Sequence, residues 1–214
     1  MARRLLAEYL GSALLAALVI GSGIAAQQLS EDVGLQLLEN AVATAAGLYA
    51  LILVFGPVSG AHFNPVVSLV DAALGGRPWR DVAAYIAAQI AGCASGALLA
   101  NGMFALSAAS ISTHHRASPA HLLAEVVATA GLILVIFALA RNGHHGHVPA
   151  AVGAYIGAAY WFTSSTSFAN PAITIGRTLS DTFAGIAPAS VPSFILAQLA
   201  GALVALGLVR ALYP

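Results

Sequence analysis

Two asparagine–proline pairs are the residues of this sequence whose type and spacing could do chemistry on a solute. Asn64 precedes Pro65, and Asn170 precedes Pro171. Proline is accepted in the first turn of a helix and asparagine is a good N-cap, so each pair predicts a helix start. The capping amide also has N–H groups to offer a passing hydroxyl, beside the partial positive charge of the helix terminus. We expect two polar points that can donate a hydrogen bond to a water or a hydroxyl and that repel cations.

Two acidic residues lie within or near apolar segments. Glu8 follows the start of the first segment, and Glu125 lies early in the fourth. An acid at membrane depth is costly and usually functional. Glu8 could alternatively reach the interface from its helix start, but a repeated pattern (below) favours one structural role for both.

The seven histidines do not predict a metal site. Six of them fall in two clusters between apolar segments: His144, His145 and His147, and His114, His115 and His121. Metal sites need a defined ligand set with supporting hydrogen bonds, and neither cluster supplies one. We expect solvated loop histidines and no cofactor. A pH response of either loop stays open, because histidine titrates near neutrality.

The composition indicates a membrane protein. Of 214 residues, 59% are hydrophobic and 7% are charged, with a mean hydropathy of +0.87. A soluble domain carries about 25% charged residues, so bilayer lipid is the expected solvent. The formal net charge is zero, which gives no reason to expect a nucleic acid partner.

Six stretches are long and apolar enough to span a bilayer, which takes about 20 residues. They are roughly Leu5–Gln27, Leu38–Val58, Val82–Leu106, Ala120–Ala140, Val148–Ser165 and Val191–Tyr213. The first resembles a signal peptide, but it is long enough to span and five more follow, so we expect it to be retained. Two shorter pieces, about Asn64–Leu74 and Asn170–Ile186, each open with an Asn-Pro pair and predict half-helices.

The two halves of the chain resemble each other. Tyr85–Gly92 in the third span matches Phe194–Gly201 in the sixth, and the Ala-Glu pairs and Asn-Pro pairs correspond in the same order. Each half has three spans, so the second copy enters from the opposite face as an inverted repeat. We expect one channel domain over 1–214, with repeats of about 1–117 and 118–214. The half-helices must lie inside the bundle, because their ends leave backbone groups unpaired.

The arginines predict the orientation. With the N-terminus inside, six of the eight face the cytoplasm and only Arg116 and Arg177 lie outside. Positive residues accumulate on the cytoplasmic side of membrane proteins, so both termini are expected there.

The motif Ser59-Gly60-Ala61-His62-Phe63-Asn64-Pro65, together with Asn170-Pro171-Ala172 on six spans, resembles the aquaporin and aquaglyceroporin (major intrinsic protein) family. The resemblance covers nearly the whole chain. It implies an all-α homotetrameric channel, not an enzyme, with water, small neutral solutes and lipid as partners. Its pore motifs would be Asn64-Pro65-Val66, where Val66 replaces an alanine, and Asn170-Pro171-Ala172. Glu8 and Glu125 would brace the half-helices, and His62 would order the first loop.

The family's outer constriction is formed by four positions, and this sequence departs from it. An arginine normally follows the second motif, and here that residue is Ile173. Family spacing places the other three at Thr44, at Ala158 (or at Gly157) and at Ser167. None is aromatic or charged, so the resemblance implies a wider and less polar filter.

An arginine does lie one turn later, at Arg177. Residues four apart share a helix face, and the shift is about 6 Å toward the outer mouth. Arg177 could therefore place its charge in the outer vestibule, or it could pair locally with Asp181; the sequence leaves both open.

The stretch Thr163–Thr174 also resembles a bacterial subgroup of arsenical-conducting channels with an aliphatic residue in place of the filter arginine. That resemblance implies a passive channel in the bacterial inner membrane. Its solutes would be glycerol-like polyols, uncharged arsenite with water and, as a further candidate, methylated arsenicals. The alternatives are a water-selective aquaporin and a secondary transporter built on broken helices. A structural membrane protein with a closed pore is a third.

Overall fold

The computed structural model describes residues 1–213, and within them every regular element is helical. Eight α-helices follow in chain order: α1 (Ala2–Leu29), α2 (Val33–Ser59), α3 (Pro65–Ala73), α4 (Trp79–Met103), α5 (Pro119–Arg141), α6 (Val148–Phe162), α7 (Pro171–Gly176) and α8 (Val191–Leu212). Three 3-10 turns accompany them: η1 (His145–His147), η2 (Arg177–Leu179) and η3 (Pro188–Ser190). The expected end of the second repeat, residue 214, lies outside the described residues.

Five helices are long and apolar enough to cross a bilayer: α1, α2, α4, α5 and α8 with η3. The sixth, α6, has 15 residues, about 22 Å at 1.5 Å per residue. The structure corrects one boundary, because the second half-helix does not continue to Ile186. Its α-helical part ends at Gly176 and tightens into η2, and Ser180 then adopts an extended conformation.

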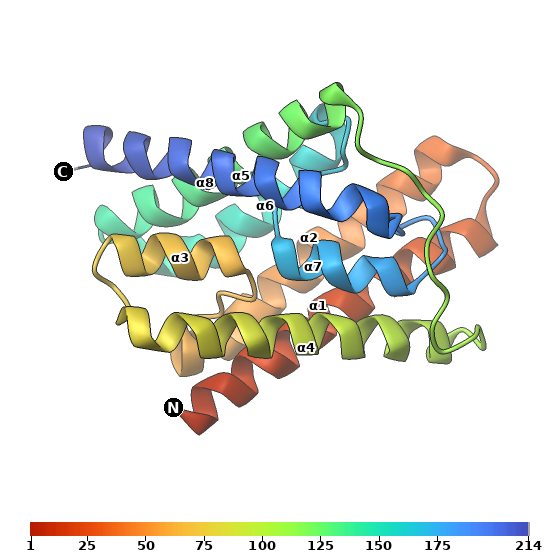
Figure 1. Cartoon of the computed structure of the whole chain (residues 1–214), viewed down its shortest axis with the longest axis horizontal. Coiled ribbons are helices and arrows are strands. Elements are labelled where there is room, and N and C mark those ends of the chain that lie inside the picture. Colours follow the sequence, from red (N-terminus) through yellow and green to blue (C-terminus); the bar gives the residue numbers. More distant parts are fainter. Residues whose placement is uncertain (214) are drawn as a thin grey trace.

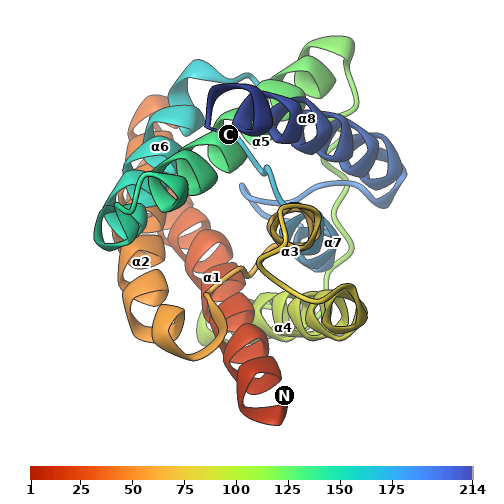
Figure 2. The same cartoon turned by 90° about the vertical axis from the view of Figure 1, so that its left-hand side faces the viewer.

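The two half-helices occupy the middle of the bundle. Figure 2 looks along the bundle from the end that holds both termini, with α3 in the centre, α7 behind it and the other six helices around them. In Figure 1, α3 and α7 lie one after the other between α4 and α8, and they contact each other. Both also contact α4 and α8, so the half-helices are enclosed by protein and not by lipid. The predicted fold class, an all-α membrane protein with six spans and two half-helices, is confirmed.

Close helix packing follows the repeat. α1 packs on α4 in the first half, and α5 packs on α8 in the second. A Cβ added at Gly96 would lie 2.0 Å from the Ala13 carbonyl oxygen, and one added at Gly201 would lie 2.5 Å from that of Val126. Small residues let membrane helices approach closely enough for van der Waals contact to hold them together.

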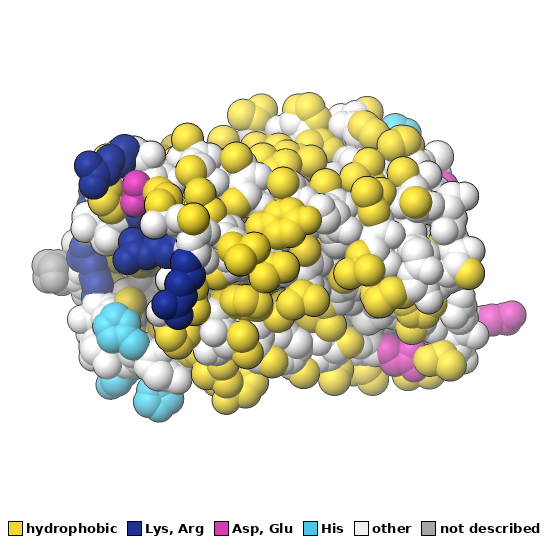
Figure 3. Space-filling view, turned by 90° about the horizontal axis from the view of Figure 1, so that it is seen from below, with side chains coloured by type: hydrophobic (Ala, Val, Ile, Leu, Met, Phe, Trp, Pro, Cys, Tyr) yellow, Lys and Arg dark blue, Asp and Glu magenta, His cyan; other side chains and the backbone are white. Residues whose placement is uncertain are grey.

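The outer surface is apolar and the charges lie at the ends. In Figure 3 hydrophobic side chains cover the middle, and arginine and histidine side chains gather at the left-hand end, where the termini lie in Figure 1. Large apolar side chains on α1 and α8 face outward, including Leu6, Leu10, Leu196 and Leu203. An apolar belt with polar ends is the surface that a bilayer requires.

Gly96→Ala should destabilise the fold, because its methyl group would overlap the Ala13 carbonyl and push α1 from α4. Overpacking of this kind costs about 1–3 kcal/mol. Gly207→Ala in α8 is the matched control, since nothing lies within 4 Å of the added Cβ. Thermal unfolding in detergent, followed by loss of the monodisperse peak, measures both. Equal midpoints for the two variants would contradict the packing argument.

Candidate pore and solute path

The loops that lead into the two half-helices share an unusual backbone. Ala61 and Phe63 have φ of 50° and 48°, and the equivalent Ser167 and Ala169 have φ of 53° and 48°. Non-glycine residues rarely adopt positive φ, and such strain persists only where the surroundings enforce it. Each loop therefore needs hydrogen bonds that hold it in place.

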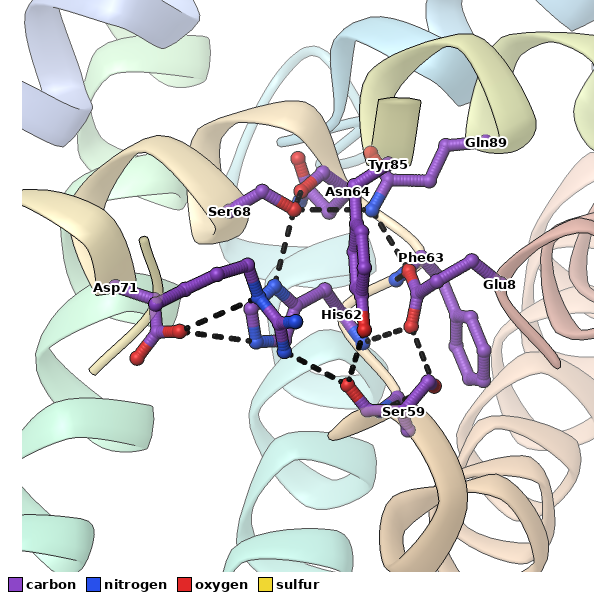
Figure 4. Close-up of polar contacts among 11 residues, drawn as sticks. Glu8, Ser59, His62, Phe63, Asn64, Ser68, Asp71, Tyr85 and Gln89 are labelled. Atoms are coloured by element: carbon purple, nitrogen blue, oxygen red, sulfur yellow. Dashed lines mark hydrogen bonds and ion pairs between the residues drawn. The ribbon is translucent and has the colours of Figure 1, made fainter. Parts of the chain in front are cut away.

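Glu8 supplies these bonds in the first loop, as Figure 4 shows. One carboxyl oxygen accepts from the Ser59 hydroxyl at 2.6 Å and from the His62 backbone N–H at 3.0 Å. The other accepts from the Phe63 N–H at 2.8 Å and from the Gln89 amide at 2.7 Å. Glu8 is fully buried, and all four contacts are donations to it.

Glu125 repeats the arrangement in the second loop. It accepts from the Ser165 hydroxyl at 2.7 Å and from the Phe168 N–H at 2.9 Å through one oxygen. The other oxygen accepts from the Ala169 N–H at 2.9 Å and from the Gln198 amide at 2.6 Å. Like Glu8, Glu125 is fully buried, so each half of the chain holds its loop with the same four kinds of donor.

The two motif asparagines link the loops to each other. The Asn64 amide donates to the Ala169 carbonyl at 2.8 Å, and the Asn170 amide donates to the Phe63 carbonyl at 2.8 Å. Their Oδ1 atoms cap α3 and α7. The second N–H of each amide has no acceptor within residues 1–213, and both asparagines line the main cavity. A hydroxyl passing between them can accept from both.

That cavity, of about 640 Å³, runs past both motifs from Arg177 at one end to Asp71 and His145 at the other. Its walls are mostly aliphatic, with contributions from α1, α2, α5 and α6: Val19, Leu48, Ile52, Ile136, Val152 and Ile156. A path with apolar walls and a few polar groups binds a solute weakly enough to release it.

Three of the four expected filter positions, Thr44, Ser167 and Ile173, line this path. The fourth does not. Ala158 is exposed on the outer surface, and Gly157 faces Ala45 of α2.

Tyr160 of α6 lines the path and Ala158 does not, so the path has an aromatic side chain that the four expected positions did not include. The α6 residues on the path recur every four positions: Val148, Val152, Ile156 and Tyr160. Residue 158 is half a turn away from that row, since each residue advances a helix by about 100°. α6 is apolar on all sides, so no periodicity in its sequence singles out this tyrosine.

Polar groups at this level are arranged to meet a solute. The Tyr160 and Thr44 hydroxyls lie 3.2 Å apart and form one hydrogen bond. Ser167 is 4% exposed, and its hydroxyl has no hydrogen-bond partner among the described residues. Ser167 therefore holds a buried, unsatisfied hydroxyl beside the path.

Arg177 lies further along, at the end of the path opposite Asp71, and is 2% exposed. Its guanidinium carbon lies 3.4 Å from the centre of the Phe168 ring, and its Nε donates to the Ala184 carbonyl. The alternative pairing with Asp181 is wrong. That carboxylate accepts from the Thr113 N–H at 2.8 Å, and this hydrogen bond lowers the pKa of Asp181.

His62 contacts the first half-helix on the other side of the motifs. Its Nδ1 lies 3.0 Å from the Ser68 hydroxyl, and its Nε2 lies 3.6 Å from the Asp71 carboxylate (Figure 4). The histidine cluster of the α5–α6 connection adds His145 to the same end of the path. Within residues 1–213, no three His, Cys, Asp or Glu side chains are grouped to hold a metal.

Glu125→Gln should abolish solute flux and lower thermal stability. The amide nitrogen of the glutamine cannot accept a hydrogen bond, so a loop N–H group that donates to Glu125 in the wild type would lose its acceptor. Leaving a buried donor unsatisfied costs about 1–3 kcal/mol. Glu31→Gln, at an exposed residue between α1 and α2, is the control. Glycerol flux and unfolding temperature of both variants are the measurements. A stable, fully active Glu125→Gln protein would show that the loop does not depend on this carboxyl.

Comparisons with known proteins agree with this geometry. The family model described as Major intrinsic protein matches residues 1–167. The aquaglyceroporin AqpS of Rhizobium meliloti (strain 1021) is 50% identical over 210 residues, which cover 98% of this chain and 90% of AqpS. Aquaporin-10 of Milnesium tardigradum is 33% identical and covers 86% of this chain and 52% of its own.

The X-ray structure of the aquaglyceroporin from Plasmodium falciparum has the same fold. It matches with a TM-score of 0.78 at 19% identity, covering 99% of this chain and 96% of its own. The chain therefore belongs to the major intrinsic protein family, whose members are integral membrane channels for small solutes and not enzymes.

Proposed function

We propose that this channel conducts small neutral solutes with several hydroxyl groups, among them glycerol and arsenite, together with water. The observation that carries the proposal is the pair Ile173 and Ser167 on the path. Ile173 stands where the family's constriction normally has a fixed arginine, and Ser167, whose buried hydroxyl has no partner among the described residues, lines the same path. A solute such as As(OH)3 meets an aliphatic wall on one side and hydrogen-bonding groups on the other. The 50% identity to an aquaglyceroporin supports the same class of solute.

Methylated arsenicals are a further candidate. A methyl group in place of a hydroxyl of arsenite lowers the number of hydrogen bonds that the solute can make and gives it an apolar side. The methyl group could contact the aliphatic side chains of Ile156 and Ile173, which line the same path as the polar residues Thr44 and Ser167. The resemblance to the arsenical-conducting subgroup rests on the same aliphatic residue at 173.

A water-selective channel is the second candidate, and Tyr160 favours it. The ring and its hydrogen bond to Thr44 narrow the path next to Ile173. A secondary transporter is disfavoured, because coupling to ions needs a buried acid that is free to bind them. Glu8 and Glu125 each already accept four hydrogen bonds from their loops.

We further propose that four copies assemble in a bacterial inner membrane with both termini in the cytoplasm. The orientation rests on six arginines that the order of the spans puts on the same side of the membrane as both termini: Arg3, Arg4, Arg77, Arg80, Arg141 and Arg210. The tetramer rests on family membership alone.

The direct test is stopped-flow permeability of proteoliposomes that contain the purified protein. Water, glycerol and arsenite should all pass faster than through empty vesicles, with a flux linear in the gradient and independent of proton and sodium gradients. Fast water flux with exclusion of both glycerol and arsenite would reject the proposal in favour of a water channel.

Ile173→Arg should reduce glycerol and arsenite flux by about tenfold, which corresponds to about 1.4 kcal/mol on the barrier. Arginine is longer than isoleucine and would bring a further cation near Arg177 and Arg116, so the path narrows and its solvent is held in place. Water should be affected less, and methylarsenite most.

Ile173→Val is the matched control, because it keeps the wall aliphatic. Flux is normalised to the protein incorporated in the vesicles. Solute ratios that stay unchanged in Ile173→Arg would show that residue 173 does not form the constriction.

A further inference from the structure

Asp71 and Arg177 occupy equivalent places in the inverted repeat. Asp71 is the seventh residue after Asn64, and Arg177 is the seventh residue after Asn170. Each lies two turns beyond a motif asparagine, at or just past the end of its half-helix. Because the repeats are inverted, the two side chains reach opposite ends of the same path, and both line it. The other described residues on the path that can carry a charge are histidines, His62 and His145, whose charge depends on protonation.

The guanidinium at the positive end is in contact with no carboxylate among residues 1–213; Glu125, behind the Phe168 loop, is the acid nearby. Arg177 is 2% exposed and contacts the Phe168 ring and the Ala184 carbonyl. No acidic side chain lies within 4.0 Å of its guanidinium in the described chain. A second arginine, Arg116, lies behind the same ring, with its guanidinium carbon 5.5 Å from the centre of Phe168. A buried cation without a counter-ion projects a positive potential into the lumen beside it.

The negative end is built differently. One Asp71 oxygen lies 3.7 Å from Nε of Arg77 and 3.6 Å from Nε2 of His62 (Figure 4). The Arg77 guanidinium is fixed in turn by a 2.8 Å hydrogen bond to the Ser59 carbonyl and by the face of Tyr85.

The other Asp71 oxygen is held against the backbone of Gly76, where a Cβ would lie only 2.1 Å from it. A glycine at position 76 is therefore what admits the carboxylate. The side chain keeps 20% of its surface exposed, toward the cytoplasmic end of the path. His145, from the α5–α6 connection, also lines the cavity at this end. Arg210 of α8 donates to the Ala73 carbonyl at the end of α3.

We propose that Asp71 is the anion barrier of this channel, and that ion exclusion is divided between its two mouths. Arg177 and the positive ends of the two half-helices repel cations. Glu8 and Glu125 lie behind the loops and do not line the path. Without Asp71, the charges on the path itself, apart from histidine, would be positive, and Arg77 would lose its partner, so small anions would be drawn in. The carboxylate pairs with Arg77 and, because it lines the path with 20% of its side chain exposed, it is the negative group that an anion meets there. The path then admits uncharged solutes, although its constriction lacks the usual fixed arginine.

This inference rests on the proposed function, because it assumes that the cavity conducts. The test is Asp71→Asn, which keeps the shape and removes the charge. Proteoliposomes with wild-type or variant protein are assayed at pH 7.5 for glycerol flux and for nitrate flux under a potassium–valinomycin diffusion potential. Asp71→Asn should raise nitrate flux about tenfold over wild type and leave glycerol flux within about twofold. Adding Arg177→Gln should bring nitrate flux back down.

Asp81→Asn is the matched control, since it removes the same charge at the same end of the protein but away from the path. A second variant separates charge from folding. Asp71→Cys is modified with an anionic, a neutral or a cationic methanethiosulfonate. The wild type, whose one cysteine, Cys93, is buried, is treated in parallel. Only the anionic adduct should restore nitrate exclusion.

The outcomes are distinct. Normal glycerol flux with no gain of nitrate flux in Asp71→Asn, and in unmodified Asp71→Cys, would overturn the inference and leave the proposed function intact. Equal nitrate flux for the anionic and cationic adducts would also overturn it. A wild type that conducts no glycerol would instead reject the proposed function.

Discussion

The structure depends on two buried carboxyl groups that hold non-helical backbone inside a bilayer. A re-entrant loop at membrane depth exposes N–H groups that lipid cannot satisfy. Glu8 and Glu125 each accept two such N–H groups, together with a serine hydroxyl and a glutamine amide. These bonds offset the strain of the positive-φ residues that turn each chain back toward the centre. Without them the half-helices would have no fixed starting point, and the asparagines could not meet.

The crossed hydrogen bonds of the motif asparagines extend this constraint from each loop to the pair. Asn64 donates to the carbonyl before Asn170, and Asn170 donates to the carbonyl before Asn64. One N–H of each amide is thus used to fix geometry, and the other is left for the solute. The polar points on the path are rigid because each one is already bonded elsewhere, so they do not need to be ordered again for every molecule that passes.

Along this path the two halves are alike in backbone and different in charge. The repeat places a side chain of each half at the same depth beyond its asparagine, and the sequence fills one place with Asp71 and the other with Arg177. The environments follow the charges. The carboxylate is given Arg77 and His62 as partners, whereas the guanidinium is given an aromatic face and a carbonyl. A symmetric fold can therefore carry opposite charges at the two ends of its path. Two identical residues at these positions would give the same potential at both ends.

The architecture can be predicted from the amino-acid sequence. Charge scarcity, apolar stretches and two Asn-Pro pairs in a repeat were enough to predict the fold, because these signals are local or depend only on order along the chain. The sequence did not determine which residues face the path. Ala158 was placed there by spacing, but the rotation of α6 is set by its contacts with α2 and α5, and these turn Tyr160 inward. The same holds for Arg177, because residues four apart in a helix are neighbours and the sequence therefore allowed an ion pair with Asp181. In the folded chain, the Thr113 N–H donates a hydrogen bond to the Asp181 carboxylate. The Arg177 guanidinium instead packs on the ring of Phe168. The direction of a side chain is decided by contacts between segments that are distant in the sequence. Local sequence patterns do not show these contacts.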